Sequence, residues 1–128
     1  MTHLSTGIDL VEIDRIRRLL ADSEKQRAEI FSPIEVDYCS NKKKNQFQHF
    51  AARFAAKEAV LKALGTGILT GFKLKDIEVV NGAGGKPEIN LHGKVKEAAD
   101  AKGVIEILVS LSHSSEYAVA NVILVSSE

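Results

Sequence analysis

Two acidic side chains occupy positions whose neighbours are apolar. Glu58 lies in RFAAKEAVLKALGTG (residues 53–67), a segment with helical spacing. When successive side chains are placed about 100° apart around the helix axis, Glu58 falls on the apolar face of that helix. Asp9 is two residues before Val11 and four before Ile13, so in a strand its side chain lies on the same apolar face as theirs. If the two carboxylates converge, they repel each other unless a hard cation lies between them. Mg²⁺ held by one or two carboxylates plus substrate phosphates suits that arrangement.

Each acid also has a simpler interpretation. Glu58 and Lys62 have the i, i+4 spacing of a common helix ion pair. Asp9 follows Gly7 closely, as a capping or turn-bonding aspartate often does. Two acids on two apolar faces favour the metal site, although the sequence leaves the simpler interpretations open.

Basic residues surround Glu58 in the sequence. Between residues 41 and 62 it is one acid among six bases, namely Lys42, Lys43, Lys44, Arg53, Lys57 and Lys62. Basic side chains beside a carboxylate pair predict a site for a polyanion such as a diphosphate. The alternative for lysines 42 to 44 is a solvated loop.

A second basic group comprises Arg15, Arg17 and Arg18 in the first predicted helix. These arginines form either a charged, solvent-exposed face of the helix or a docking surface for an acidic protein.

His113 is the histidine best placed to act, because it follows Leu111 at strand spacing in the polar turn SLSHSSEY. Beside Ser112 it could hydrogen-bond a phosphate or relay a proton, although turn histidines are often structural. The segment GAGGKP lacks the lysine–serine/threonine ending of a P-loop, so it predicts a hairpin turn with Lys86 as a phosphate contact.

The elements that must position these side chains are helical early in the chain and β-rich late. Helices are predicted over residues 14–31, with a break at Ser23, and over 32–39, where Ser32 and Glu35 have the spacing of a capping box. A third helix runs up to Leu64, with Asn45 and Gln48 as a cap and Gly65 as a left-handed end. Strands are predicted at residues 5–13, 76–81 and 87–93, with a loop at 65–71, a short helix at 93–103 and a hairpin over 104–126. The first strand of this hairpin has apolar residues in alternation, at Ile105, Ile107, Val109 and Leu111. This order predicts an α+β fold, a single domain over residues 1–128 in which an antiparallel sheet packs with a long buried helix.

The bulk composition is that of an ordinary globular protein. The 128 residues are 45% hydrophobic and 27% charged, with 17 acids and 17 bases, so no global charge favours nucleic acid or anionic lipid. Cys39 is the only cysteine, which excludes an internal disulfide and fits a reducing compartment. Neither a membrane span nor a signal peptide is evident, so we expect a cytoplasmic protein.

Five blocks of the chain, in order, resemble the holo-acyl-carrier-protein synthase family, the small bacterial 4′-phosphopantetheinyl transferases. They are GIDLVEIDRI, FSPIEVDYC, RFAAKEAVLKALGTG, GKP and SLSHSSEYAVA, which together span nearly the whole chain. The resemblance implies an enzyme that transfers the phosphopantetheine arm of coenzyme A to a serine of acyl carrier protein and releases adenosine 3′,5′-bisphosphate.

The resemblance also implies roles for individual residues. Asp9 and Glu58 would bind Mg²⁺ with the diphosphate of coenzyme A, Lys62 would contact the phosphates, and Arg15 would meet the acidic helix of the carrier protein. The set that would hold the nucleotide and its phosphates is Arg53, Lys62, Gly65, Lys86, Ser112 and His113.

Family members are typically homotrimers with active sites between subunits, which would place His113 of one subunit beside Asp9 and Glu58 of a neighbour. The long helix also has a face of alanines, at 52, 56, 59 and 63, which a trimer would account for. In the implied reaction Lys62 would offset charge on the leaving side, and Glu58 or a metal-bound water would take the serine proton, with Glu35 as a distant alternative. A non-catalytic coenzyme A sensor and a structural trimerisation module are the competing interpretations.

Overall fold

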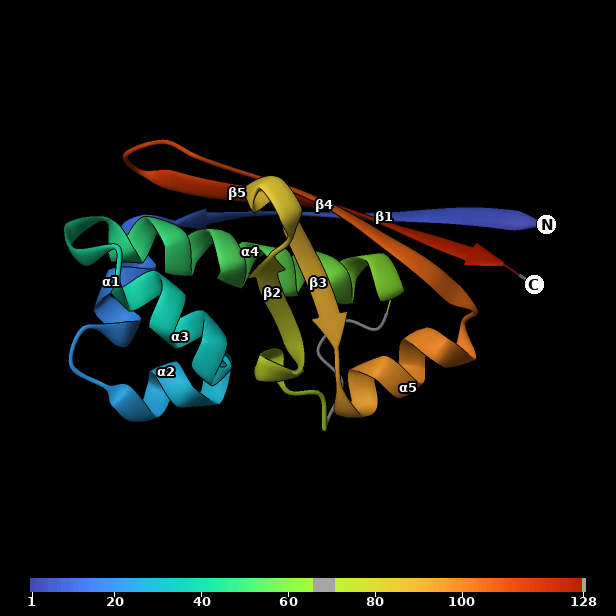
Figure 1. Ribbon diagram of the computed structural model, residues 1–128, viewed down its shortest axis with the longest axis horizontal. Helices are drawn as coiled ribbons and strands as arrows, with labels where there is room; N and C mark the ends of the chain where they lie inside the picture. Colours follow the sequence, from blue (N-terminus) through green and yellow to red (C-terminus); the bar gives the residue numbers. More distant parts are fainter. Residues whose placement is uncertain (66–70, 128) are drawn as a thin grey trace.

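An antiparallel sheet lies across one side of the long helix α4 (Gln46–Leu64) in the computed structural model, which describes residues 1–65 and 71–127 (Figure 1). The strand order is β1 (Thr2–Glu12), β5 (Tyr117–Ser127), β4 (Val104–His113). A separate hairpin pairs β2 (Ile77–Asn81) with β3 (Pro87–Leu91). The predicted α+β class, with an antiparallel sheet packed on a long buried helix, is confirmed.

The shorter helices gather at the two ends of α4 (Figure 1). Helices α1 (Ile13–Leu20), α2 (Glu24–Ile30) and α3 (Pro33–Ser40) lie toward its N-terminal end, and α5 (Gly93–Ala101) lies toward the other. Three short 3₁₀ turns, at Lys43–Asn45, Leu74–Asp76 and Ala83–Gly85, connect elements. No helix of the described part of the chain is long and apolar enough to cross a membrane.

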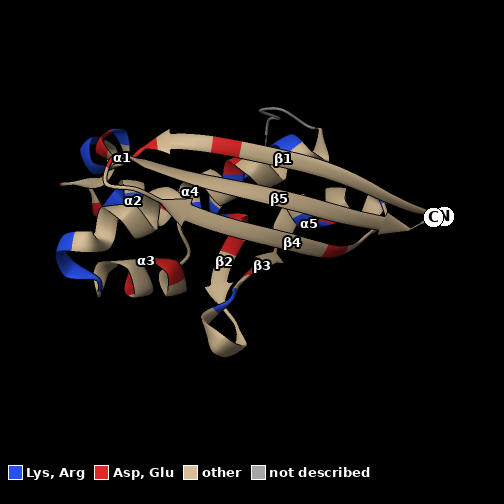
Figure 2. Cartoon of the chain, turned by 90° about the horizontal axis from the view of Figure 1, so that it is seen from above, with Lys and Arg blue, Asp and Glu red and all other residues tan. Residues whose placement is uncertain are grey.

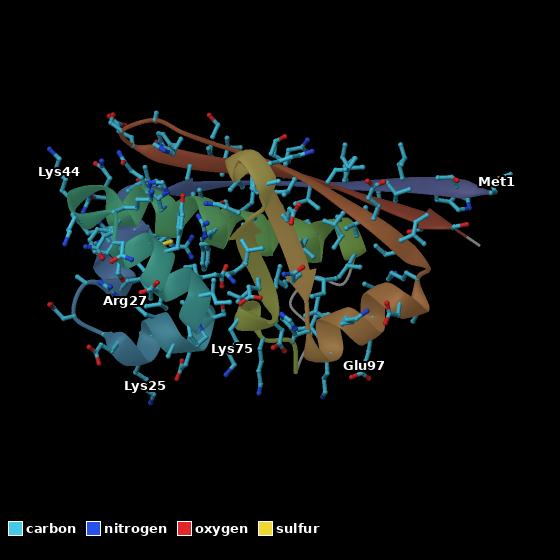
Figure 3. The ribbon with its side chains drawn as sticks, in the orientation of Figure 1. Met1, Lys25, Arg27, Lys44, Lys75 and Glu97 are labelled. Atoms are coloured by element: carbon cyan, nitrogen blue, oxygen red, sulfur yellow. The ribbon has the colours of Figure 1, made fainter. Side chains whose placement is uncertain are left out.

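Side-chain caps begin two of the early helices. The hydroxyl of Ser23 accepts from the backbone N–H of Gln26, which confirms the break between α1 and α2. Ser32 and Glu35 form the complete capping box predicted for α3, an arrangement that stabilises a helix by about 1 kcal/mol. Arg27, labelled in Figure 3, then ties α2 to its surroundings through hydrogen bonds to the carbonyl of Leu20 and the side chain of Gln46.

Helix α4 is enclosed by its own chain. Its alanines at 52, 56, 59 and 63 are all buried. A Cβ atom on Gly7 of β1 would overlap the carbonyl of Ala59, so the strand backbone lies directly against the helix. The alanine face therefore packs on β1 within one subunit, and the expectation that a trimer interface explains it is wrong.

Three local details differ from the sequence prediction. β1 begins at Thr2 and ends at Glu12, because Ile13 is already the first residue of α1. Asn45 does precede α4, but its side chain makes no capping hydrogen bond. A register irregularity between Val104 and Glu106 leaves Ile105 68% exposed, outside the inward alternation of β4. Gly65 has the predicted left-handed conformation, with φ of 72°, and part of the predicted loop that follows (66–70) lies outside the described residues.

Candidate active site

Strand β1 turns Asp9 toward α4. Along this strand Gly7 and Val11 are buried while Ile8 and Leu10 are exposed, and Asp9 has the inward parity, with 15% of its side chain exposed. The strand parity predicted from the sequence is therefore correct.

Glu58, on α4, lies across from Asp9 of β1 and is partly buried. Burial raises the pKa of the Glu58 carboxyl above its ordinary value, and the negative charge of Asp9 raises this pKa further. Lys62 and Arg15 oppose this rise. Two carboxylates from distant parts of the sequence thus interact electrostatically, with two cations beside them.

Lys62 pairs with Asp9 in the structure. Its Nζ donates to Asp9 Oδ1 at 2.9 Å and to the carbonyl of Ile8 at 3.0 Å. The i, i+4 interpretation assigned Lys62 to Glu58, so the structure gives the lysine a different carboxylate partner. Because 54% of the Lys62 side chain stays exposed, its ammonium group is accessible to a ligand.

Lys57 does not belong to this site, contrary to its place among the predicted polyanion-binding bases. Its side chain is fully buried, and Nζ donates to Glu35 Oε1 at 2.7 Å and to the carbonyls of Leu74 and Ile77. Glu35 is equally buried and also accepts from the backbone N–H of Val79 at 2.9 Å. A carboxylate enclosed in this way cannot reach a substrate hydroxyl, so the alternative that Glu35 takes a proton is wrong.

Arg53 lies one turn before Lys57 on α4 and is 3% exposed. Its guanidinium stacks over the ring of Tyr38, with Cζ 4.3 Å from the ring centroid, and Nη2 donates to Asn81 Oδ1 at 3.4 Å. Its Nε is buried and has no hydrogen-bond partner among the described residues. A buried cation with an unsatisfied donor is suited to an anionic ligand.

His113 lies at the end of β4, next to Ser112, and both are exposed. These two residues line a hollow of about 220 Å³ together with Leu10, Ser114, Tyr117, Ala118 and Val119. The imidazole of His113 also contacts that of His49 on α4, with ring centroids 6.0 Å apart. The sequence alone does not distinguish His49 from an ordinary helix residue, since its one signal is the i, i+4 spacing to Arg53.

The three arginines of α1 differ in their surroundings although all are exposed. Arg17 and Arg18 both form ion pairs with Asp14. Arg15 instead lies over the ring of Phe54, 5.8 Å from its centroid, and acts on the pKa of Glu58. The basic surface of α1 therefore borders the acid pair through Arg15.

The remaining predicted contacts are exposed. Lys86 follows the turn between β2 and β3, and Gly65 ends α4 about two turns after Glu58. Lys42 lies over Tyr38, with Nζ 4.6 Å from the ring centroid. Lys44 projects from the end of the molecule (Figure 3), as expected for a solvated loop residue.

The described residues contain no cluster of three or more His, Cys, Asp or Glu side chains that could hold a metal ion. A divalent cation at this site would therefore have two protein carboxylates, with its other positions filled by substrate oxygens and water. That is a coordination pattern that Mg²⁺ commonly adopts.

Comparison with known proteins gives consistent matches over nearly the whole chain. The family model of the 4′-phosphopantetheinyl transferase superfamily matches residues 5–122. The holo-[acyl-carrier-protein] synthase of Syntrophus aciditrophicus is 49% identical, over 97% of this chain and 96% of that protein.

The similar solved structures include complexes with coenzyme A. The holo-(acyl-carrier-protein) synthase of Bacillus anthracis in complex with CoA (3′,5′-ADP) is 37% identical, with a TM-score of 0.78 over 96% of each chain. The ACPS–CoA complex of Chronobacterium ammoniagenes is 27% identical, with a TM-score of 0.84 over 98% of this chain and 99% of that one.

Proposed function

The chain belongs to the 4′-phosphopantetheinyl transferase superfamily, and on this basis we propose that it transfers the 4′-phosphopantetheine arm of coenzyme A to a serine of acyl carrier protein. The reaction requires Mg²⁺ and releases adenosine 3′,5′-bisphosphate. The observation that carries this proposal is the approach of Asp9 to Glu58, with Lys62 and Arg15 beside them.

The acid pair has the chemistry of a magnesium site. Asp9 raises the pKa of Glu58, so the two carboxylates repel each other, and a divalent cation would relieve this repulsion. Carboxylate oxygens are hard ligands of the kind that Mg²⁺ prefers. Asp9 and Glu58 are thus the residues that would hold the ion, which would neutralise charge on the bridging phosphates of coenzyme A.

The protein side chains contribute mainly by positioning the reacting groups and by stabilising negative charge. The serine oxygen bonds to the β-phosphorus of coenzyme A while the bond from that phosphorus to the adenosine 3′,5′-bisphosphate oxygen breaks. Lys62 moves from Asp9 to the diphosphate and stabilises the negative charge on the leaving oxygen. Glu58, directly or through one water, accepts the serine proton.

The carrier protein docks on α1. Arg15 is exposed and close enough to act on Glu58, so an acidic helix bound over α1 would bring its serine next to the acid pair. Arg17 and Arg18 extend the same basic surface, and their shared partner Asp14 would exchange for carboxylates of the carrier protein.

In each chain, the residues that hold the 3′-phosphate of coenzyme A lie at a second location, away from the acid pair of that chain. Arg53, Ser112 and His113 hold the 3′-phosphate there, whereas Gly65, three residues after Lys62 on α4, and Lys86 contact the remaining phosphates. His49, which touches His113, is nine positions before Glu58 on α4, and at the helical rise of 1.5 Å the two residues are about 13.5 Å apart along the axis.

We propose a homotrimer in which the acid pair of one subunit faces Arg53 and His113 of a neighbour. The outer face of the sheet, turned away from α4, supports this arrangement because its strands carry few charged residues (Figure 2). Large exposed apolar side chains on these strands are Leu4, Ile8, Leu10, Ile105, Leu108 and Tyr117. An apolar face of this kind is typical of an interface.

Residues 1–128 act as a single transferase domain in this proposal, located in the cytoplasm. The only cysteine, Cys39, is free and fully buried, which is compatible with a reducing compartment.

The direct test combines the protein with coenzyme A, Mg²⁺ and apo-acyl carrier protein, followed by mass spectrometry of the carrier. We expect a mass gain of one phosphopantetheine group that disappears with a chelator or with a Ser→Ala carrier. Binding of coenzyme A with no mass gain would instead favour a sensor. A trimer with no coenzyme A binding at all would favour a structural module.

A further inference from the structure

His49 lies between two other rings at the N-terminal half of α4. Its imidazole packs edge-on against Tyr38 of α3, with centroids 5.8 Å apart and planes at 77°, and against His113 of β4 at 6.0 Å and 62°. One helical turn later on the same helix comes Arg53, whose guanidinium covers the ring of Tyr38. His49 is therefore the side chain that connects α3, α4 and the end of β4.

Within the described part of the chain, the charged groups that act on the pKa of His49 are all basic. They are Arg53 on its own helix, Lys42 after α3 and His113 on β4. Burial lowers the pKa of His49 below its ordinary value, and these positive charges lower this pKa further. The ring is consequently neutral in the free protein near pH 7, in a cluster with surplus positive charge.

We propose that His49 is a positioning residue of the 3′-phosphate subsite, which takes up one proton when a dianionic phosphomonoester binds beside Arg53 and His113. The proton comes from solvent and resides on the His49 imidazole for as long as the phosphate is bound. This role rests on the proposed binding of the coenzyme A nucleotide at Arg53 and His113, and it makes recognition of the 3′-phosphate dependent on pH.

The direction of the effect follows from the charges. A phosphomonoester carries about −1.5 to −2 charges at pH 7, which offsets the repulsion from Arg53, Lys42 and His113. The bound phosphate therefore raises the pKa of His49 relative to the free protein. The added affinity is fully present below the free-state pKa and is lost as the pH rises through the bound-state pKa.

The ring packing gives His49 a second effect on the same subsite. Because His49 contacts His113 directly, it fixes the orientation of that exposed imidazole, and His49 is itself packed against Tyr38. A variant that keeps the aromatic packing but cannot bind a proton separates the two effects.

The experiment compares the wild-type protein with His49→Phe, which retains a ring, using adenosine 3′,5′-bisphosphate as the probe and adenosine 5′-monophosphate as the control ligand. Calorimetry in two buffers of different ionisation enthalpy measures the protons taken up on binding. Ionisation of the ligand itself is the same for both proteins, so the difference between them reports His49.

We expect the wild-type protein to take up more protons than His49→Phe with the bisphosphate, and equally few with the monophosphate. When the pH is lowered from 7.5 to 6, the fold-increase in affinity for the bisphosphate should be about three times larger for the wild-type protein than for the variant. In NMR titrations, the pKa of His49 should rise when the bisphosphate is added.

Two results would overturn the proposal. If the bisphosphate binds but leaves the pKa of His49 in the wild-type protein unchanged, and the proton uptake equals that of His49→Phe, the role of His49 is wrong and the proposed transfer reaction is unaffected. If the bisphosphate fails to bind the wild-type protein, the subsite is wrong as well. The mass gain of the carrier protein then decides separately whether the transferase function stands.

Discussion

The buried pair of Lys57 and Glu35 provides a test of whether Lys57 stabilises the fold while Lys62, on the same helix, is free to serve the active site. Lys57→Met removes a side chain with no exposed area whose Nζ serves Glu35 and two backbone carbonyls. Removing one partner of a buried ion pair costs about 3–5 kcal/mol, because the other charge stays buried without compensation. Lys62, five residues further on, is half exposed, and its pair with Asp9 is screened by solvent.

The expected loss converts into a large change in melting temperature. At about 2.1 cal/mol/K per residue, the unfolding entropy of 128 residues is about 0.27 kcal/mol/K, so Lys57→Met should lower Tm by about 11–19 °C. Lys62→Met, the matched control, should change the free energy of unfolding by less than about 1 kcal/mol. Urea denaturation and thermal unfolding measure both.

A double variant checks that the loss comes from the uncompensated charge. In Lys57→Met with Glu35→Gln the buried carboxylate is gone, so the combined loss should be clearly smaller than the sum of the single losses. A Lys57→Met protein within about 1 kcal/mol of the wild type, or losses that simply add, would refute the reasoning.

Three further predictions address the position of the acid pair and its neighbours. Gly7→Ala should destabilise the protein by about 1–3 kcal/mol or more in urea denaturation, because the new methyl group would overlap the carbonyl of Ala59; an unchanged midpoint would contradict this packing. Arg15→Glu should raise the KM for carrier protein much more than the KM for coenzyme A, whereas equal changes would place Arg15 away from the docking surface. Asp9→Asn should lower the pKa of Glu58 in NMR titrations, since the Asp9 charge raises that pKa, and an unchanged pKa would show that the two groups do not interact.

Local rules were sufficient for most of the fold. The capping box of Ser32 and Glu35, and the left-handed Gly65, depend on residues within one or two turns, and both are present as predicted. The inward direction of Asp9 follows from strand alternation alone. These features are readable because the interactions that create them join close neighbours in the sequence.

Partners that are distant in the sequence were not predictable in the same way. Lys57 had the same basic character as Arg53 and Lys62, and only the packing of α3 and β2 around it shows that Glu35, 22 residues away, is its partner. The contact between His49 and His113 likewise depends on how the end of β4 meets α4. Helical periodicity identifies the face on which a residue lies, but it does not specify what covers that face.

The central claim is that Asp9 and Glu58 hold one divalent ion together. Its most direct test is the binding of Mn²⁺, followed by electron paramagnetic resonance in the presence of coenzyme A, to the wild type, Asp9→Ala, Glu58→Ala and the double variant. Because both carboxylates serve one ion, each single variant should lose nearly as much affinity as the double variant. Wild-type affinity in either single variant, or losses that add independently, would contradict a shared site.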